Sequence, residues 1–150
     1  MLIVDYQSKS YYRFLSNMPQ IAQHKTRFLI TFNGGDKSQL SEFCDALTSE
    51  TNSNIQTTNV IEQKSSEEVV AKLFSEARDS RHILNFESAD RLFDKKTAVK
   101  ASHERDNGFD LNNLFKQIAK HNGIVVLAPQ QKQILSASMS TKMDVMIRFK

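Results

Sequence analysis

Five short β-rich runs alternate with segments of helical spacing, and this alternation constrains the fold more than any other feature. The run Ile124–Ala128 (IVVLA) is apolar throughout, which is typical of a parallel strand buried on both faces. The other four runs are Arg27–Phe32, Ile55–Ile61, Ile83–Phe86 and Asp144–Phe149. Strands that alternate with helices favour a three-layer α/β/α sandwich with one mainly parallel sheet.

The length of the chain suits a single domain. With 150 residues, of which 39% are hydrophobic, it can bury a sizeable core. We divide it into an N-terminal helical segment, residues 1–26, and a core, residues 27–150. The N-terminal segment has a short apolar start, Met1–Asp5, followed by apolar residues at helical spacing. Pro19 interrupts that spacing, so we expect a helix that is kinked or split there and that packs on the edge of the sheet.

A glycine turn follows the first core strand. Arg27–Phe32 runs into an Asn-Gly-Gly sequence that contains Gly34 and Gly35, and Lys37 and Ser38 stand where the next helix begins. This is the layout of a phosphate-binding loop, in which backbone N–H groups at a helix N-terminus cradle phosphates. We therefore identify these two glycines, the lysine and the serine as candidate phosphate contacts.

The phosphate-loop pattern G-x-x-x-x-G-K-[S/T] is met only in part. Counting back from Lys37, the two required glycines fall on Asp36 and Thr31. A carboxylate at residue 36 would repel a phosphate by about 1 kcal/mol in water and by several times that in a drier site. Its side chain also obstructs the close backbone approach that glycine permits. The alternative interpretation is that Lys37 and Ser38 are ordinary polar residues at the start of a helix.

The stretch His82–Phe93 (HILNFESADRLF) carries a second candidate part of a site. Its apolar run breaks into Glu87, Ser88 and Asp90. Polar residues at this position lie at the carboxyl end of a buried strand, which is where open α/β sheets bind ligands.

This stretch resembles the Walker B strand of AAA+ ATPases, which is written as four apolar residues and then D-E-A-D-x-L-F. Glu87 stands where the family has the aspartate that helps to hold Mg²⁺, and Ser88 stands where it has the glutamate that activates the attacking water. The remaining positions match, at Ala89, Asp90, Leu92 and Phe93. The resemblance therefore implies an ATPase fold that has lost its reaction.

Other segments follow the AAA+ pattern in the same order. The segment 65–78 (SSEEVVAKLFSEAR) resembles an AAA+ helix, but Ile61–Lys64 before it lacks the aromatic residue with which protein-remodelling members grip their substrate. Gln130 stands where the family has the asparagine of sensor 1. Thr141 and Lys142 stand where it has arginine fingers. Relatives continue after the last strand into a helical lid, and we expect no lid here.

The tract after the Walker B-like strand resembles AAA+ proteins encoded with phage-tail-like contractile injection systems. The residues that stay in step with those proteins are Lys95, Thr97, Val99, His103 and Arg105. His103 can also be interpreted as an ordinary surface histidine.

The resemblance implies the P-loop NTPase strand order 5-1-4-3-2 over residues 27–149. We expect a catalytically inactive AAA+-like domain that binds another protein, such as an active AAA+ ATPase or a secretion or phage-tail-like assembly, and self-association is compatible with this role. We expect no catalytic residue and no bound cofactor. The vestigial nucleotide contacts would be Gly34, Gly35, Lys37, Ser38, Glu87 and Gln130.

Two other functions stay open. One is a nucleotide-binding protein or weak ATPase, in which Lys37, Ser38 and Glu87 would bind ATP and Mg²⁺ in a site completed by a partner. The other is nucleic-acid binding, for which a net charge of +3 gives a weak case because Lys and Arg are dispersed among acids.

Cysteine content and hydropathy bound the remaining chemistry. Cys44 is the single cysteine and lies on a predicted helix face, so we expect a buried thiol and no metal site. No apolar run approaches the roughly 18 residues that a membrane span needs, and the start lacks the pattern of a signal peptide. We therefore expect a cytoplasmic protein.

Overall fold

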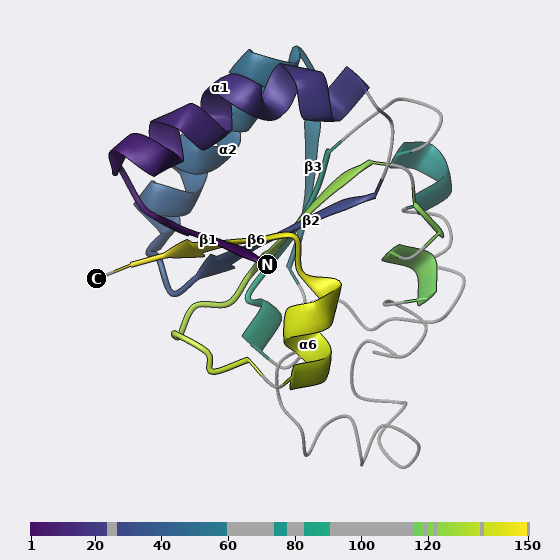
Figure 1. Ribbon diagram of the computed structural model, residues 1–150. Helices are drawn as coiled ribbons and strands as arrows, with labels where there is room; N and C mark the ends of the chain where they lie inside the picture. Colours follow the sequence, from purple (N-terminus) through teal and green to yellow (C-terminus); the bar gives the residue numbers. More distant parts are fainter. Residues whose placement is uncertain are drawn as a thin grey trace.

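A single parallel sheet organises the computed structural model. The structure describes residues 1–23, 27–59, 74–77, 83–90, 116–118, 120–121, 123–135 and 137–149. Within these residues six strands pair in the order β1-β6-β2-β5-β4-β3, and every pairing is parallel (Figure 1). The strands are β1 (Leu2–Asp5), β2 (Phe28–Asn33), β3 (Ile55–Asn59), β4 (Ile83–Glu87), β5 (Ile124–Ala128) and β6 (Val145–Arg148).

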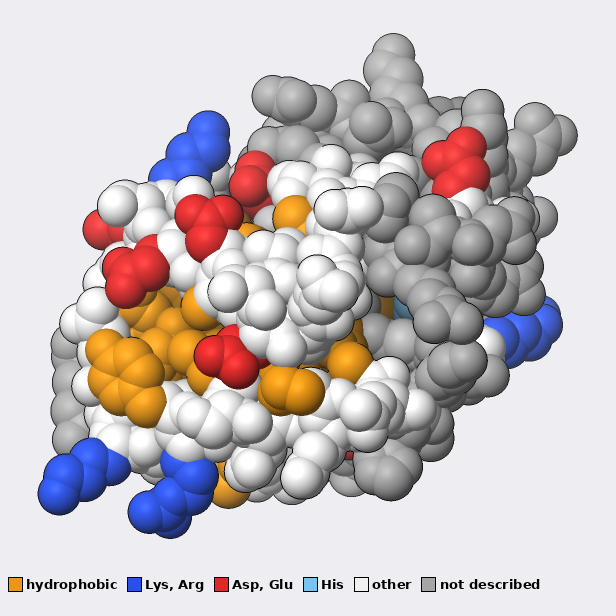
Figure 2. Space-filling model, turned by 90° about the horizontal axis from the view of Figure 1, so that it is seen from above, with side chains coloured by type: hydrophobic (Ala, Val, Ile, Leu, Met, Phe, Trp, Pro, Cys, Tyr) orange, Lys and Arg blue, Asp and Glu red, His pale blue; other side chains and the backbone are white. Residues whose placement is uncertain are grey.

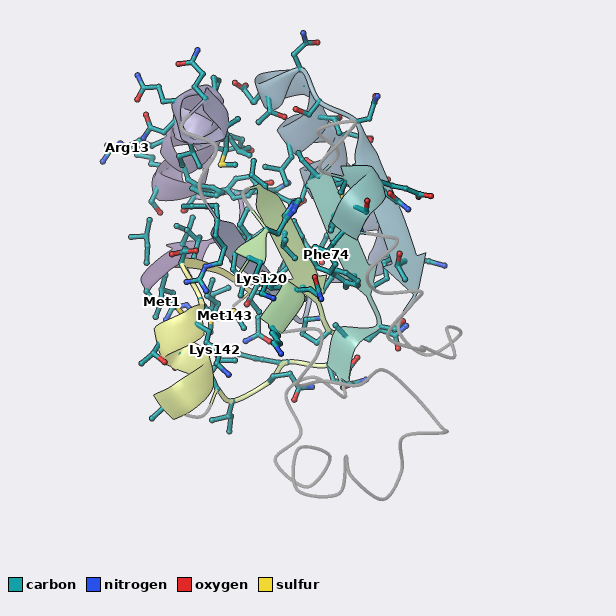
Figure 3. All side chains as sticks on the ribbon, turned by 90° about the vertical axis from the view of Figure 1, so that its right-hand side faces the viewer. Met1, Arg13, Phe74, Lys120, Lys142 and Met143 are labelled. Carbon is teal, nitrogen blue, oxygen red and sulfur yellow. The ribbon has the colours of Figure 1, made fainter. Side chains whose placement is uncertain are left out.

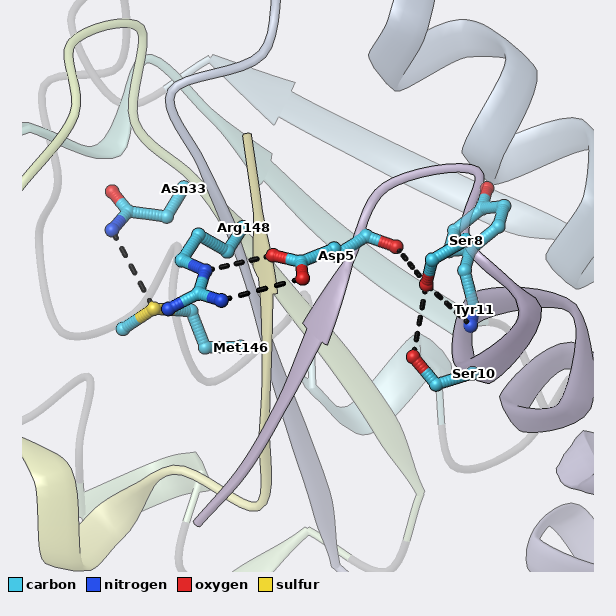
Figure 4. Close-up of polar contacts among 7 residues, drawn as sticks. All are labelled: Asp5, Ser8, Ser10, Tyr11, Asn33, Met146 and Arg148. Carbon is cyan, nitrogen blue, oxygen red and sulfur yellow. Dashed lines mark hydrogen bonds and ion pairs between the residues drawn. The ribbon is translucent and has the colours of Figure 1, made fainter. Parts of the chain in front are cut away.

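The predicted order of the five core strands is confirmed, since β6-β2-β5-β4-β3 is the order 5-1-4-3-2. The predicted number of strands is wrong, because β1 adds a sixth at the edge beside β6. The backbone N–H of Leu2 donates to the carbonyl of Asp144, and Arg148 Nε donates to Asp5 Oδ1 at 2.7 Å (Figure 4). Four residues are too short a run to show a period of their own, so only these pairings reveal the strand.

Two long helices cover one face of the sheet. Helix α1 (Lys9–Gln23) and helix α2 (Lys37–Thr51) lie side by side above it in Figure 1. The sequence predicts a helix that is kinked or split at Pro19, and α1 is not split there: it continues through the proline as one helix. Proline removes one helix hydrogen bond, but apolar residues on both sides of it pack into the same core and hold the two halves together. Those residues are Leu15, Met18, Ile21 and Ala22.

Two helix boundaries differ from the sequence-based expectation. Thr48–Asn54 reads as a polar loop, yet α2 continues to Thr51, where the hydroxyl donates to the carbonyl of Leu47 at 2.6 Å. Asn52 then ends the helix in the left-handed conformation, with φ of 51°. For Gln133–Met139 the sequence predicts a turn or a short helix, and the structure has a short helix, α6, at Ala137–Lys142. A threonine hydroxyl can donate to a carbonyl one turn earlier in the helix, so a polar residue does not have to lie in a loop. The polarity of the segment alone therefore does not show where the helix ends.

The core has one apolar layer on each side of the sheet. Alternate residues of β5 divide between them: Val125 and Leu127 face the first layer, whereas Ile124 and Val126 face the layer under α1 and α2. Phe74, from a helical segment at residues 74–77, packs in the first layer. The predicted three-layer α/β/α architecture is confirmed.

Several sequence-based predictions lie outside the described residues. They concern Ile61–Lys64, most of the helix expected at 65–78, and the tract that contains Lys95, Thr97, Val99, His103 and Arg105. In the part of the chain that is described, no helix combines the length and apolarity needed to cross a bilayer.

Candidate functional site

A cleft of ≈ 290 Å³ opens at the carboxyl ends of β4 and β5, beside the N-terminus of α2. Four of the six predicted site residues line it together: Gly35, Lys37, Glu87 and Gln130. Its other lining residues are Asp36, Leu40, Ser88, Ala128 and Pro129. Gly34 and Ser38 do not line it, although both belong to the turn and helix start that form one wall. The cleft lies where parallel α/β sheets bind ligands, as the sequence predicts.

The turn between β2 and α2 is short and tightly enclosed. Residues 34–36 alone connect the strand to the helix. Gly34 has φ of +95°, and a Cβ atom there would lie 3.1 Å from Cα of Lys132. Gly35 lies against two aromatic rings, so that a Cβ atom there would come within 2.4 Å of Phe32 and 2.5 Å of Phe149. Both glycines are therefore required by packing inside the chain, whatever the cleft binds.

Asp36 occupies a backbone donor at the N-terminus of α2, where a phosphate-binding loop holds phosphate. Its Oδ1 accepts the backbone N–H of Gln39 at 2.8 Å, and its own N–H donates to Gln39 Oε1 at 2.9 Å. The two bonds form a capping box at the N-terminus of α2. A carboxylate of the protein thus sits where the helix dipole would attract an anion.

We expect Asp36→Ala to lower the free energy of unfolding by about 1 kcal/mol, because the cap of α2 is lost. Asp36→Asn should retain most of that stability, since asparagine caps helices about as well as aspartate. The midpoint and slope of urea unfolding of both variants measure the difference. Equal losses in the two variants would show that the charge of Asp36, rather than its capping bond, stabilises the helix.

The two Walker B-like residues, Glu87 and Ser88, differ in burial and in backbone conformation. Glu87 ends β4, is partly buried and lines the cleft. Ser88 is only 4% exposed and has φ of 53°, a left-handed conformation that is uncommon for residues other than glycine. A serine hydroxyl is a poor general base, so Ser88 cannot activate water as a glutamate does. Among the described residues, no three His, Cys, Asp or Glu side chains gather into a metal-binding group.

Asp90 and Asn33 do not line the cleft, but both hold the segment that contains Gln130. The carboxylate of Asp90 accepts the backbone N–H groups of Gln130 and Gln131, both at 2.9 Å. Asn33, which is 2% exposed, accepts the N–H of Gln133 at 2.8 Å and donates to its carbonyl at 3.0 Å. The Walker B match singled out Asp90, but nothing in the pattern indicates that it fixes the segment containing Gln130.

Two other predicted positions are placed by the structure. Thr141 and Lys142, at the arginine-finger position, lie on α6, which is on the opposite side of the sheet from α1 and α2 (Figures 1 and 3).

Cys44 is buried on α2, as predicted. Burial, followed by the nearby charges of Glu87 and Asp45, raises the pKa of the Cys44 thiol to about 12, so the thiol stays protonated near neutral pH.

The face over α1 and α2 carries no continuous basic patch among the described residues. Figure 2 shows Lys and Arg side chains at its margins, with Asp and Glu between them and apolar side chains near the middle. This face therefore lacks the contiguous basic footprint with which proteins bind nucleic acid.

The sheet order, and the glycine turn that leads from β2 into a helix N-terminus, have the layout of a P-loop NTPase fold. No family model matches the sequence, and no curated protein sequence matches it. Solved structures do match. The chain aligns over 95% of its length with the crystal structure of the FIGL-1 AAA domain, with a TM-score of 0.69 and 13% identity. It aligns over 94% of its length with a chain of the E. coli MS115-1 HORMA:CdnC:Trip13 complex, with a TM-score of 0.66 and 15% identity.

A third similar structure is C. elegans PCH-2, with a TM-score of 0.57 and 11% identity over 95% of this chain. The chain spans 52%, 62% and 42%, respectively, of the three chains that it matches. At these identities the likeness concerns the fold alone: the chain has the fold of AAA+ ATPase domains.

Proposed function

We propose that this chain is an AAA+-like domain that does not hydrolyse ATP and that acts by binding another protein. The observation that carries the proposal is the capping box of Asp36. Its carboxylate accepts the N–H of Gln39 at 2.8 Å, which removes a donor from the place where the fold normally holds phosphate. A triphosphate would have to displace that carboxylate and also overcome its negative charge.

Three further features support the loss of turnover. The turn of residues 34–36 is too short to wrap a phosphate chain with backbone N–H groups, as a longer P-loop does. Ser88 lacks the basicity of the glutamate that it replaces. Lys142 keeps the positive charge of an arginine finger but lacks the planar fork that binds phosphate oxygens in pairs. Each change in a working ATPase lowers the rate by orders of magnitude, so together they leave little activity.

Protein binding is the second half of the proposal. One similar structure is a chain from a HORMA:CdnC:Trip13 complex, so this fold occurs inside an assembly of several proteins. The resemblance of the sequence to AAA+ proteins of contractile injection systems points in the same direction. We therefore propose that the partner is an active AAA+ ATPase or a secretion or phage-tail-like assembly.

A nucleotide-binding switch is the second candidate, and one observation favours it. Lys37 and Glu87 line the same cleft with Gly35 and Gln130, so a cation for phosphate and a carboxylate for Mg²⁺ are both at hand. The cleft volume of ≈ 290 Å³ lies at the lower limit for small-molecule sites, which favours the first proposal over this one.

A phosphate-release assay with ATP and Mg²⁺, run beside a thermal-shift measurement, decides between the two. We expect no release above that of Lys37→Ala, which serves as the matched control for contaminating ATPases. We also expect millimolar ATP to leave the melting temperature unchanged. A ligand present at about 100 times its Kd would add about 2.7 kcal/mol, which is several degrees for a domain of this size.

Each other outcome has a definite meaning. Turnover that Lys37→Ala abolishes would overturn the inactive domain. Stabilisation by ATP without turnover, lost in Lys37→Ala, would establish the nucleotide-binding switch instead. Protein binding is tested by purifying the tagged chain from its native cells: we expect a stoichiometric partner that forms a complex again when both proteins are purified. A chain that elutes alone contradicts this half of the proposal.

A further inference from the structure

The segment that follows β5 crosses the carboxyl end of the sheet. It lies between residues that follow or end β2 and β4, the two strands on either side of β5. We call residues 129–133 the strap. Strand β5 lies between β2 and β4, and residues associated with each neighbour hold the strap: Asn33 at the end of β2 and Asp90 just after β4. The strap is therefore fastened on both sides of the strand from which it emerges.

Four hydrogen bonds make the two fastenings. On one side, Asp90 Oδ1 and Oδ2 accept the N–H groups of Gln130 and Gln131, each at 2.9 Å. On the other side, the buried amide of Asn33 bonds both the N–H and the carbonyl of Gln133, at 2.8 and 3.0 Å. An amide that pairs with both backbone groups of one residue replaces a strand partner, so it fixes the position of that residue closely.

Gln133 joins the two fastenings. While Asn33 holds its backbone, its side-chain Nε2 donates to Asp90 Oδ2 at 3.1 Å. Between the two fastenings, the backbone of Lys132 lies so close to Gly34 that a Cβ atom on the glycine would be 3.1 Å from Lys132 Cα. The closed strap thus rests directly on the turn that leads into α2. Bonds that share partners in this way strengthen and weaken together.

We propose that the strap opens and closes as one unit over the turn of residues 34–36, and that Asp90 and Asn33 are positioning residues that hold it closed. The closed strap denies a ligand access to the backbone of Gly34 and fixes Gln130 at the wall of the cleft. Opening the strap is the conformational step that exposes this turn. The inference rests on the contacts of the strap itself, so it stands whether or not the cleft hydrolyses ATP.

Amide hydrogen exchange tests the proposal residue by residue. In Asp90→Ala the amides of Gln130 and Gln131 lose their acceptor, and their exchange should quicken by roughly 10- to 100-fold. The decisive amide is that of Gln133, which keeps its acceptor on Asn33. A strap that moves as one unit requires Gln133 to quicken as well. The amides of Val125, Val126 and Leu127 in β5 should keep their rates, since a general loss of stability would change them too.

A second variant reaches the strap from its other face. In Gly34→Ala both fastenings remain, but alanine is strained at a φ of +95° and its Cβ atom pushes on Lys132. All three strap amides should therefore quicken together, while the amides of β5 keep their rates. Ile134→Ser is the matched control, because Ile134 follows the strap directly and is 95% exposed; its exchange pattern should equal that of the unmodified chain. The proposal is overturned if Asp90→Ala quickens Gln130 and Gln131 alone, or if Gly34→Ala leaves all three amides unchanged.

Discussion

Gly35→Ala is expected to destabilise the fold by up to about 3 kcal/mol, the upper end of the range for a methyl group forced into a packed core. The added Cβ atom would lie 2.4 Å from Phe32 Cε2 and 2.5 Å from Phe149 Cζ, far inside ordinary contact. The backbone of Gly35 is outside the left-handed region, so alanine can adopt its conformation. At such a position Gly→Ala ordinarily stabilises a protein by about 0.4–1 kcal/mol, so a large loss would isolate the steric clash.

Urea unfolding measures this effect, and melting temperature provides a second readout. A domain of this size loses about 2–4 °C for each kcal/mol. Ser41→Ala, at an exposed position on α2, is the control and should stay within about 0.5 kcal/mol of the unmodified chain. An unchanged unfolding midpoint for Gly35→Ala would mean that the rings of Phe32 and Phe149 can move aside. Packing of these rings against Gly35 would then not hold the turn in place.

Phe32→Ala is expected to have the largest effect of all, a loss of about 3–5 kcal/mol. Phe32 is 1% exposed, and its ring lies 5.1 Å from that of Phe43, 4.9 Å from that of Phe149 and 5.9 Å from that of Tyr6, measured between centroids. These four residues form an aromatic cluster directly behind the glycine turn. A truncated Phe32 leaves a cavity there that the three neighbouring rings fill only in part.

The double variant with Gly35→Ala tests whether the cluster and the turn are one packing unit. Without the Phe32 ring, the Cβ atom at residue 35 enters the cavity, so the double variant should be more stable than the sum of the two losses by about 1–3 kcal/mol. Should Phe32→Ala fail to fold, the same cycle with Phe32→Leu gives a smaller coupling of the same sign. Simple additivity within about 0.5 kcal/mol would contradict a direct contact.

Ile134→Ser, which removes a fully exposed apolar side chain, should cost at most about 0.5 kcal/mol.

Sequence patterns predicted the candidate site only where it is built from one local segment. Lys37 and Glu87 could be placed at one edge of the sheet because each follows or ends a recognisable strand, and both line the same cleft. The capping role of Asp36 was not predicted, because the same residue can be interpreted as a failed glycine of a phosphate loop. Only its bonds with Gln39 distinguish a helix cap from a degraded phosphate site.

No local sequence pattern could predict the hydrogen bonds that hold the strap beside the cleft. Asn33 and Gln133 are 100 positions apart, and Asp90 meets Gln130 across 40 positions. A lone asparagine at the end of a strand and a lone aspartate after another carry no signal of their partners. The same reason explains the missed strand β1, which is tied to the other end of the chain through Asp5 and Arg148.

The sequence by itself determined the alternation of strands and helices, because apolar periodicity is a local property that each segment carries alone. Through its resemblance to AAA+ proteins it also determined the order of the five core strands. Tertiary structure alone decided which glycine is packed against aromatic rings, which carboxylate caps a helix and which fastens the strap. Those outcomes depend on contacts between distant segments, and such contacts exist only once the sheet has brought the segments together.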